Sequence, residues 1–591
     1  MTTDLLFKNF HLLADTPGGV KKLRELILQL AVQGRLVPQN PDDEPASVLL
    51  EKIREEKNRL IREGKIKQQK PLPEIRPEEV PYELPEGWKW ARLKNISFDL
   101  GQKKPDMEFT YIDVASIENT SGKVSRDLQV IQPQNAPSRA RKIVHKNTVI
   151  FSTVRPYLLN IAVIEDDYFP EPIASTAFAI LHPCSGISSM FLFYFLRSNV
   201  FIDYVNSKMT GIAYPAINDS NFFSGPIPIP PSSEQHRIVA KVDQLMSLCD
   251  ELEARQEKQK ATHVRLNKSV LHALTESRTR DELSSNWTRI KDNFNLLFTT
   301  SESIQELRSS ILQLAVQGRL VSQIPEEEPA SVLLEKIREE KKRLVQEGKI
   351  KKQKPLPEIK PDEVPFELPK GWEWVRLGDH FDVRDGTHDT PKYTNIPNGY
   401  PLITSKNLCS GKLDFSTVKY ISEDDHKKIS VRSKVENRDV LFAMIGTIGN
   451  PVIVETTRQF SIKNVALFKY YNIELTSPKY LKYFLQYAAM QMREQATGGV
   501  QAFVSLGLIR RYLFPLPPLP EQYRIVAKVD HLMTFCDELE SDLSQSQTDG
   551  KKLMEAVMAQ LSAASNQQVP GVQTPRQQSG CSMNSEVGAC N

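Results

Sequence analysis

Apolar residues recur three or four positions apart near the start of the chain, which predicts helices there. In residues 23–36 these positions are Leu23, Leu26, Ile27, Leu30 and Ala31, and Gly34 lies where such a helix would end. A second helix is predicted from Pro45 to Gly64, and the Glu, Lys and Arg on its other face are typical of a solvated surface. Five prolines between residues 70 and 90 exclude a helix there and predict an extended linker.

The chain contains this pattern twice. The string ILQLAVQGRLV occurs at residues 27–37 and again at 311–321, and ELPEGWKWARL at 83–93 matches ELPKGWEWVRL at 367–377. Similarity then fades, and it returns as EQHRIVAKVDQLMSLCDELE at 234–253 and EQYRIVAKVDHLMTFCDELE at 521–540. Each copy is too long for a solenoid repeat, which has about 20–50 residues. The sequence therefore predicts a tandem duplication and a molecule with pseudo-twofold symmetry.

The returning segment predicts a long helix over residues 234–276. Its apolar residues alternate in steps of four and three, the a/d spacing of a coiled coil, at Ile238, Val242, Leu245, Cys249 and Leu252, and again at Ile525, Val529, Leu532, Cys536 and Leu539. After a weaker stretch we expect the pattern to resume at Leu266 and Val270, mirrored by Leu553 and Val557. The simplest partner for one such helix is its equivalent in the other copy. We therefore predict an antiparallel pair with Cys249 and Cys536 in the core, not as ligands or nucleophiles.

The segments in which similarity fades, residues 91–233 (middle domain 1) and 375–520 (middle domain 2), are predicted to be globular. Both mix short β-branched runs with turns, and residues 190–200 and 478–492 have helical patterns. The predicted class is α+β, with two α/β domains related by pseudo-twofold duplication and separated by long antiparallel coiled-coil helices. The predicted boundaries are 1–90 for a helical arm and linker, 91–233, 234–374 for a helical spacer with the second arm, 375–520, 521–565 for a spacer helix, and 566–591 for a disordered polar tail.

The sequence contains no recognisable catalytic motif. It has no GxxxxGK[ST] phosphate loop, no GxGxxG cofactor loop and no Asn/Asp-Pro-Pro-aromatic tetrapeptide of an amino-methyltransferase. Its carboxylates and lysines lack the spacing of a metal-dependent nuclease, and its ten histidines are scattered. We therefore predict no catalytic residue, no metal site and no cofactor in this chain.

Features typical of nucleic-acid binding are local. Residues 138–156 contain no acid and five basic residues, Arg139, Arg141, Lys142, Lys146 and Arg155. A solvated basic loop is the alternative, but we favour phosphate or base contact because the run leads into a hairpin-like pattern. In middle domain 2, turns that concentrate donors and acceptors predict contacts at Arg384, Gly386, Thr387, His388 and Lys392, and at Thr404, Ser405, Lys406 and Asn407. Two further small-residue turns hold Thr210, Gly211 and Tyr214, and Thr497, Gly498 and Gln501. For all four of these turns the alternative to DNA contact is turn chemistry alone.

Composition narrows the class of protein. A net charge of +3 excludes a histone-like binder but allows local basic patches. No apolar run approaches the roughly 18–20 residues of a membrane helix, and the N-terminus lacks a secretory pattern, so no membrane association is expected. Six cysteines without a CxxC pair indicate a reducing compartment, and we predict a cytoplasmic protein.

In order along the chain, these segments resemble the specificity (S) subunits of type I restriction–modification enzymes, in the subgroup with long repeats. The resemblance extends to about residue 565. It rests on LPEGWKWARL and LPKGWEWVRL, on FSTVRPYLLNIAVI in middle domain 1, on DGTHDTPKY, YPLITSKNL and FAMIGTIGNPVIV in middle domain 2, and on proline-rich exits before EQxRIVAKVD.

The resemblance implies that each middle domain is a target recognition domain reading half of a split, asymmetric site in double-stranded DNA. Two modification (methyltransferase) subunits and further restriction (translocase/endonuclease) subunits would dock on the helical repeats. Those partners would use S-adenosylmethionine, ATP and magnesium for adenine methylation and DNA cleavage, and this chain would be a non-catalytic specificity subunit. The alternatives are a coiled-coil scaffold with two peptide-binding domains and no DNA role, or an enzyme with an unrecognised active site.

Overall fold

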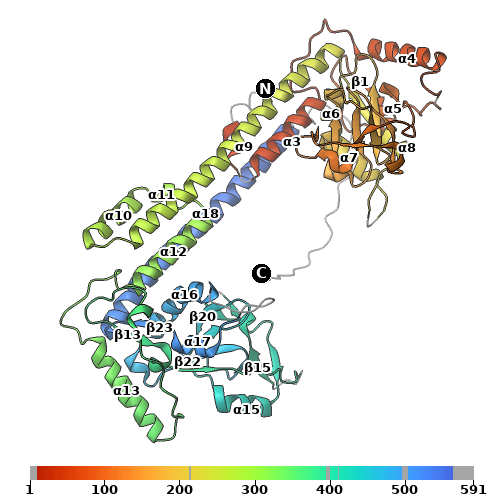
Figure 1. The fold of residues 1–591 in the computed structure, drawn as a ribbon. Helices are drawn as coiled ribbons and strands as arrows, with labels where there is room; N and C mark the ends of the chain where they lie inside the picture. The colour runs from red at the N-terminus through yellow and green to blue at the C-terminus, as the bar shows by residue number, and fades with distance from the viewer. Residues whose placement is uncertain are drawn as a thin grey trace. The chain divides into compact units, whose positions relative to one another are not determined.

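The computed structural model describes residues 10–16, 18–68, 70–211, 214–394, 399–409, 411–494 and 503–563. These residues form two compact units, unit 1 with residues up to 259 and from 547, and unit 2 with residues 260–546. Each unit contains an arm of two helices, a middle domain of short strands and helices, and the start of a long helix (Figure 1). The predicted α+β class with a duplicated α/β domain is confirmed.

The arm helices form where the apolar spacing predicts them. They are α3 (Gly19–Val32) and α4 (Ala46–Arg62) in unit 1, and α12 (Ser301–Val316) and α13 (Ala330–Gln346) in unit 2. Gly34 follows α3 at a φ of 69°, and a Cβ there would lie 3.0 Å from the Trp88 ring, so the position requires glycine. Shorter helices precede the arms, namely α2 (Phe10–Ala14), α10 (Arg280–Asp292) and α11 (Phe294–Leu297). In the described parts of the proline-rich linkers, the regular elements are the 3-10 turns η1 (Pro77–Glu79) and η5 (Pro361–Glu363).

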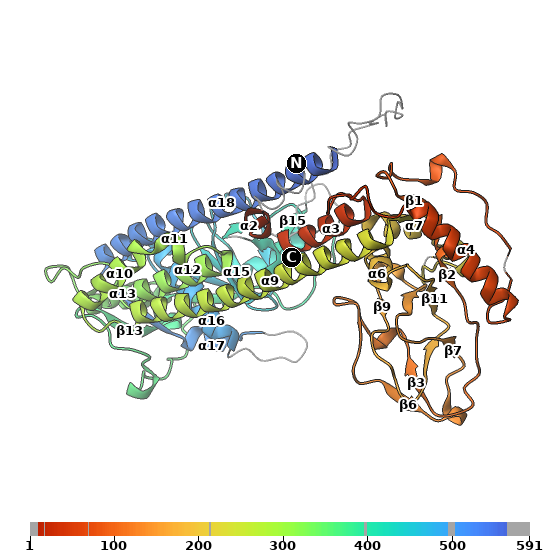
Figure 2. The same ribbon diagram turned by 90° about the horizontal axis from the view of Figure 1, so that it is seen from above.

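The two long helices are α9 (Ser232–Thr275) and α18 (Leu519–Ala563). Helix α9 begins in unit 1 and ends in unit 2, whereas α18 begins in unit 2 and ends in unit 1. The a/d residues at the start of α9 are buried in the core of unit 1 together with α3, which runs beside α9 in Figures 1 and 2, and with Met554 of α18. Cys249 and Cys536 are both fully buried in these cores, so their prediction as core residues is confirmed.

The expected continuation of the heptad pattern is wrong at Leu266 and Leu553, whereas Val270 and Val557 are partly buried and pack against the cores. Leu266 and Leu553 are 41% and 57% exposed, whereas the next residues, Asn267 and Met554, are buried. A straight α-helix drifts by about 20° per heptad relative to a strict seven-residue repeat. Several turns beyond Cys249, the buried face has therefore moved to the neighbouring position in both helices.

The two middle domains share their strand pairing. One four-stranded antiparallel sheet has the order β2-β11-β8-β9 in middle domain 1 and β14-β22-β19-β20 in middle domain 2. Its strands are β2 (Ser97–Phe98), β8 (Val149–Ser152), β9 (Ile161–Val163) and β11 (Phe178–Pro183), and β14 (Asp382–Asp385), β19 (Val440–Ala443), β20 (Gly449–Ile453) and β22 (Val465–Lys469). A two-stranded ribbon closes each domain, and its strands are β1 (Lys89–Arg92) with β12 (Pro226–Ile229) and β13 (Glu373–Arg376) with β23 (Leu513–Leu516).

A second sheet differs between the domains. Its order is β6-β3-β10-β7 in middle domain 1 and β18-β15-β21 in middle domain 2. The strands are β3 (Phe109–Ile112), β6 (Gln129–Ile131), β7 (Ala140–Ile143) and β10 (Pro172–Ser175), and β15 (Tyr400–Ile403), β18 (Lys419–Ile421) and β21 (Ser461–Ile462). Small hairpins follow, built from β4 (Ile117–Glu118) with β5 (Lys123–Val124) and β16 (Leu408–Cys409) with β17 (Lys412–Leu413). Where the first domain has β7, the second has helix α15 (Glu423–Ser433), which packs against β21.

Helices cover the antiparallel sheets. Middle domain 1 has α5 (Leu93–Ile96), α6 (Ser189–Arg197), α7 (Asn199–Lys208) and α8 (Asp219–Phe223), and middle domain 2 has α14 (Leu377–His380), α16 (Pro478–Glu494) and α17 (Leu506–Arg511). The helix predicted over 478–492 is confirmed. The helix predicted over 190–200 is divided at Ser198, whose backbone is extended.

A buried carboxylate joins the arm, middle domain and long helix of each unit. In unit 1, Trp88 Nε1 donates to Glu234 Oε2 at 3.0 Å, and Gln39 Nε2 donates to Glu234 Oε1 at 3.2 Å. Trp372 and Gln323 make the same two bonds to Glu521 in unit 2. Burial raises the pKa of both carboxyl groups. These two hydrogen bonds to one carboxylate fix the direction in which each long helix leaves its middle domain.

Candidate nucleic-acid interface

The basic run of middle domain 1 is divided between surface and interior. Arg139 is exposed beside an open groove of about 700 Å³, called groove 1, which Asp113 and Glu118 also line. Lys142 is buried, and its Nζ lies 3.4 Å from a carboxylate oxygen of Asp219. The Lys142 ammonium is therefore paired inside the domain and has little surface left for DNA, and contact at this residue stays a prediction.

The other basic residues of this run remain at the surface. Arg141 is half-buried and donates to the carbonyl oxygen of Ala140, and the exposed Lys146 pairs with Asp167 at 3.2 Å. Exposed ion pairs of this kind contribute little stability. Arg141 and Lys146 therefore remain accessible to a DNA phosphate.

Two segments that are distant in sequence meet at Arg155. Its guanidinium lies 4.9 Å from the ring centroid of Tyr214, and its backbone N–H donates to the Pro215 carbonyl at 2.8 Å. Thr210 bonds across the same turn to Ala216, and Gly211 lies beside Thr210. The Tyr214 side chain is 69% exposed, so the Arg155–Tyr214 stack is a surface feature. A planar cation on an aromatic ring is a group that can contact both phosphates and bases.

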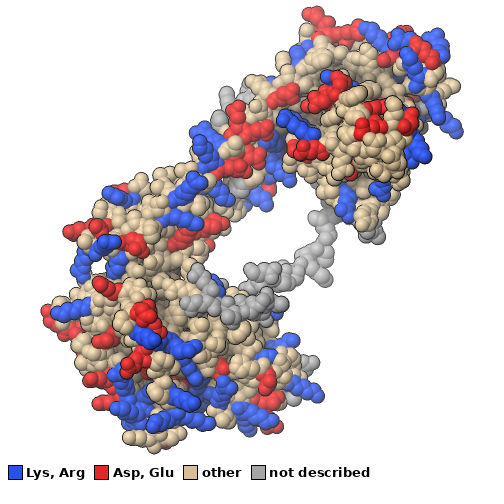
Figure 3. All heavy atoms as spheres, viewed as in Figure 1, with Lys and Arg blue, Asp and Glu red and all other residues tan. Residues whose placement is uncertain are grey.

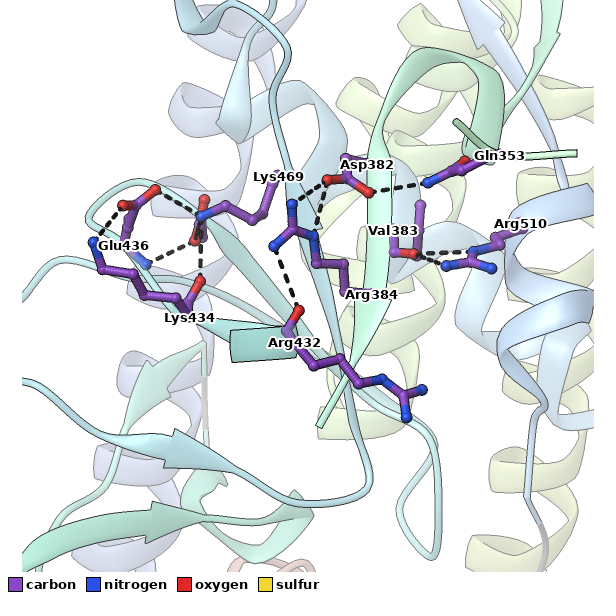
Figure 4. Close-up of polar contacts among 10 residues, drawn as sticks. Gln353, Asp382, Val383, Arg384, Arg432, Lys434, Glu436, Lys469 and Arg510 are labelled. Carbon is purple, nitrogen blue, oxygen red and sulfur yellow. Dashed lines mark hydrogen bonds and ion pairs between the residues drawn. The ribbon is translucent and has the colours of Figure 1, made fainter. Parts of the chain in front are cut away.

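In middle domain 2 several predicted residues hold the fold. Arg384 donates to Asp382 at 2.6 and 2.9 Å and to the carbonyl oxygen of Arg432, as Figure 4 shows. Gly386 is buried, and a Cβ there would clash with the backbone of Ile462. These two positions are explained by packing and leave little surface for DNA.

Neighbouring residues of the same turn are more accessible. His388 is exposed and bonds to Asp385 at 2.9 Å and to Asn464 at 3.1 Å, while Thr387 is half-buried and Lys392 is exposed. Asp385, itself buried, also accepts from Arg432. The turn is thus held in one conformation by buried and half-buried partners, with His388 and Lys392 outermost.

The segment 404–407 forms one wall of a second groove. Asn407 is buried and accepts from the backbone N–H and hydroxyl of Thr404 at 3.0 Å, which makes it a turn residue. Thr404, Ser405 and Lys406 line an open groove of about 320 Å³, called groove 2. Its lining also includes Lys419 and Lys463, which sequence reasoning missed because they are far from residue 406 in the chain.

The remaining predicted residues, Thr497, Gly498 and Gln501, lie outside the described residues, as does the predicted tail from residue 566.

Unit 2 has a further basic surface that was not predicted from the sequence. Lys and Arg side chains gather over α13 and the linker that follows it in unit 2 (Figure 3). No helix in the described ranges is long and apolar enough to cross a membrane. Within the same ranges no group of three or more His, Cys, Asp and Glu has the geometry of a metal site.

The interiors of the two antiparallel sheets differ in charge at the same position. Thr148 Oγ1 lies 3.0 Å from His182 Nδ1 in middle domain 1, whereas Lys469 Nζ donates to Asp439 at 2.8 Å in middle domain 2. Burial lowers the pKa of His182 to about 4, and the nearby His145 adds to this shift. Burial also raises the pKa of Asp439, despite the pairing with Lys469.

Comparison with known proteins decides the family. The profile of the type I restriction modification DNA specificity domain matches residues 86–263 and again residues 369–546. The chain belongs to this family. The EcoAI specificity subunit of Escherichia coli is 36% identical over 88% of this chain and 90% of its own length. The EcoEI specificity subunit of Escherichia coli is 34% identical over 91% of this chain and 93% of its own length. The crystal structure of the HsdS subunit from Thermoanaerobacter tengcongensis is 25% identical, covers 82% of this chain and 98% of that chain, and has a TM-score of 0.45.

Specificity subunits are the non-catalytic components of type I restriction–modification enzymes. The predictions of the family and of a subunit without its own catalysis are therefore confirmed by these relatives. The alternative of a scaffold with two peptide-binding domains finds no support among them. Membership of the family implies DNA and the modification and restriction subunits as partners.

Proposed function

We propose that this specificity subunit reads two different half-sites of one split, asymmetric DNA sequence, with middle domain 1 reading one half and middle domain 2 the other. The observation that carries the proposal is that the two domains share their antiparallel strand pairing but differ in the side chains and elements around corresponding grooves. A shared fold presents both surfaces to a duplex in the same manner. Different side chains on those surfaces select different bases.

The predicted contacts divide by accessibility. In middle domain 1 we assign DNA contact to Arg139, Arg141, Lys146 and the Arg155–Tyr214 stack, all of which are exposed or half-buried. In middle domain 2 we assign it to Thr387, His388, Lys392 and the 404–406 segment. Arg384, Gly386 and Asn407 would act by holding these segments in place.

The duplicated helices suggest how partners bind. Each unit presents one arm and the start of one long helix, so two modification subunits would dock on equivalent surfaces, and restriction subunits would join that core. The partners would bring S-adenosylmethionine, ATP and magnesium for adenine methylation and DNA cleavage. The complex would act in the cytoplasm.

Sequencing the methylated bases of a cell that expresses this chain with its modification subunits tests the proposal. One split motif with two different halves is expected. Exchange of residues 91–233 for another such domain should change one half and leave the other intact. Methylation at a continuous site, or a change in both halves, would contradict two independent readers.

A further inference from the structure

Groove 2 brings together three lysines from three elements. Lys406 belongs to η6 (Ser405–Asn407), Lys419 is the first residue of β18, and Lys463 follows β21. Parallel pairing of β15 with β21 and antiparallel pairing of β15 with β18 place the last two on either side of β15. The volume of this open groove, about 320 Å³, is far above the roughly 10–15 Å³ that one water molecule needs on the same measure. A phosphate group therefore fits there together with bound water.

The lysines of groove 2 have neutral neighbours. The Lys419 ammonium lies 4.4 Å from the ring centroid of Tyr393, and Lys463 Nζ donates to the Thr390 hydroxyl. The groove lining contains no carboxylate. Three like charges around one space repel one another, and an anion between them would replace repulsion with attraction.

Groove 1 lies at the corresponding place in middle domain 1 but has a different charge. Strand register and the position within the 3-10 turn match Ala115 to Lys406, Gln129 to Lys419 and Ser175 to Lys463. All three lysines are thus replaced by neutral residues. The lining of groove 1 contains two carboxylates, Asp113 and Glu118, and one arginine, Arg139. An anion that groove 2 attracts would not be attracted by groove 1.

We propose that groove 2 binds a backbone phosphate of the DNA duplex and that groove 1 does not. Middle domain 2 then supplies the larger share of the salt-dependent affinity. This inference rests on the proposed DNA-reading function. It agrees with the composition of middle domain 2, which has 19 Lys and Arg against 13 Asp and Glu. The acidic groove 1 is left for contacts with base edges that donate hydrogen bonds.

The test uses the triple variant Lys406→Gln, Lys419→Gln and Lys463→Gln, in complex with the modification subunits. Binding of fluorescent duplex DNA is measured from about 50 to 200 mM salt, a range over which phosphate contacts weaken strongly. Loss of one phosphate contact should reduce the slope of log Kd against log salt by about one. Affinity should fall by the same factor for the methylated target sequence and for an unrelated duplex, because phosphates carry no sequence information.

Two further variants act as controls. Lys412→Gln removes an exposed lysine of β17 that does not line groove 2, and it should leave the slope unchanged. Ala115→Lys with Gln129→Lys places one exposed lysine on the lining of groove 1 and another at the position that corresponds to Lys419, and it should steepen the slope. If the triple variant is misfolded by circular dichroism, Lys406→Gln alone carries the test, since Lys406 is exposed.

Each outcome points to one conclusion. An unchanged slope in the triple variant, while the wild-type complex binds DNA normally, would overturn the phosphate site and leave the proposed function standing. A loss restricted to the target sequence would also overturn it, because groove 2 would then read bases. A wild-type complex that binds no duplex at all would instead contradict the proposed function itself.

Discussion

Middle domains 1 and 2 use the same sheet position for a neutral pair in one case and an ion pair in the other. Thr148 and His182 in the first domain correspond to Asp439 and Lys469 in the second, as the strand registers show. The preceding turn keeps its geometry, since the His145 N–H donates to the Thr148 hydroxyl and the Glu436 N–H donates to Asp439. The backbone is thus retained while the chemistry of the pair changes completely.

The outer sheet shows a larger change. Strand β7, which holds Arg141 and Lys142 in middle domain 1, is replaced in middle domain 2 by α15. Both elements pack beside the strand that pairs in parallel with the central one, β10 or β21. An exchange of strand for helix at a sheet edge breaks few ladder hydrogen bonds. The edge is therefore where the two domains can differ most without loss of the shared sheets.

The hydrogen bonds from a tryptophan and a glutamine to the buried Glu234 or Glu521 should contribute equally to the stability of the two units. Trp88→Ala and Trp372→Ala each remove a buried indole and leave Glu234 or Glu521 with only its glutamine donor. Each change should cost its own unit about 3–5 kcal/mol. Urea unfolding can be followed unit by unit through pulsed labelling of two buried thiols, Cys184 in unit 1 and Cys536 in unit 2. A loss in one unit that exceeds the other by more than half would show that the two sets of hydrogen bonds are not equivalent.

Alanine substitutions in the two buried pairs, Asp439–Lys469 and Thr148–His182, should cost different amounts of stability. Asp439→Ala leaves the Lys469 ammonium largely buried, with Glu436 and the Lys434 carbonyl as its partners, and it should cost unit 2 about 2–3 kcal/mol. Thr148→Ala removes two neutral hydrogen bonds, one with His182 and one from the His145 N–H, and should cost unit 1 about 1–2 kcal/mol. The same thiol-labelling midpoints measure both. Equal losses would mean that the ion pair is no more important to its domain than the neutral pair is.

Acid should weaken the neutral pair. The pKa of His182 is about 4 in the folded chain, below the ordinary 6.5, so between these values the unfolded chain binds more protons. The stability of unit 1 therefore falls as the pH drops from 6.5 toward 4, by up to about 1.4 kcal/mol per pH unit. The ring of His145 stacks 4.6 Å from the His182 ring and contributes to the lowered pKa of His182.

The control for this prediction is His182→Gln, which removes the titrating group. Its urea midpoints, read at Cys184 between pH 7 and pH 5, should be flatter with pH than those of the wild type. Unit 2 needs its own reading, because the buried His380, with a pKa lowered to about 3, gives it a similar dependence of its own. An identical pH profile for wild type and His182→Gln would remove His182 as the cause.

The local pattern of apolar residues was sufficient to predict the main helices, and comparison of the chain with itself was sufficient to predict the duplication. The apolar spacing placed α3, α4 and α9 because each buries one continuous face, and Gly34 marked a helix end that only glycine fits. The pattern failed at Leu266, where the buried face had rotated. It also could not distinguish β7 from α15, because both are short, polar edge elements whose conformation depends on their neighbours.

The candidate site was predictable only in part, for a related reason. Lys142 is paired by Asp219, a residue 77 positions away, so its burial is invisible in the local run. Lys419 and Lys463 meet Lys406 only through the pairing of β18 and β21 with β15. Arg155 and Tyr214 were each predicted separately, and the fold joins them. Sequence composition identifies exposed basic loops, but tertiary pairing decides which cations stay accessible.

The smallest expected effect is that of replacing Arg155, where one variant distinguishes the role of the backbone conformation from the role of the side chain. This residue has a φ of 48°, and the corresponding position three residues after β19 is Gly446, with a φ of 75°. Arg155→Gly should leave unit 1 as stable or up to about 1 kcal/mol more stable, because glycine adopts positive φ without strain. It should nevertheless weaken DNA binding about fivefold, near 1 kcal/mol, because the cation above Tyr214 is lost.

Tyr214→Ala is the matched variant, since it removes the other half of the stack and leaves the strained backbone in place. If Arg155 contacts DNA directly, Tyr214→Ala should weaken binding less than Arg155→Gly does, because the cation remains. Fluorescence anisotropy with the target duplex measures both affinities. Normal affinity in Arg155→Gly would mean that the arginine serves only the turn. The loops at Arg155 and Gly446 would then have the same role in the two middle domains, because both residues have a positive φ and neither would contact DNA through a side chain.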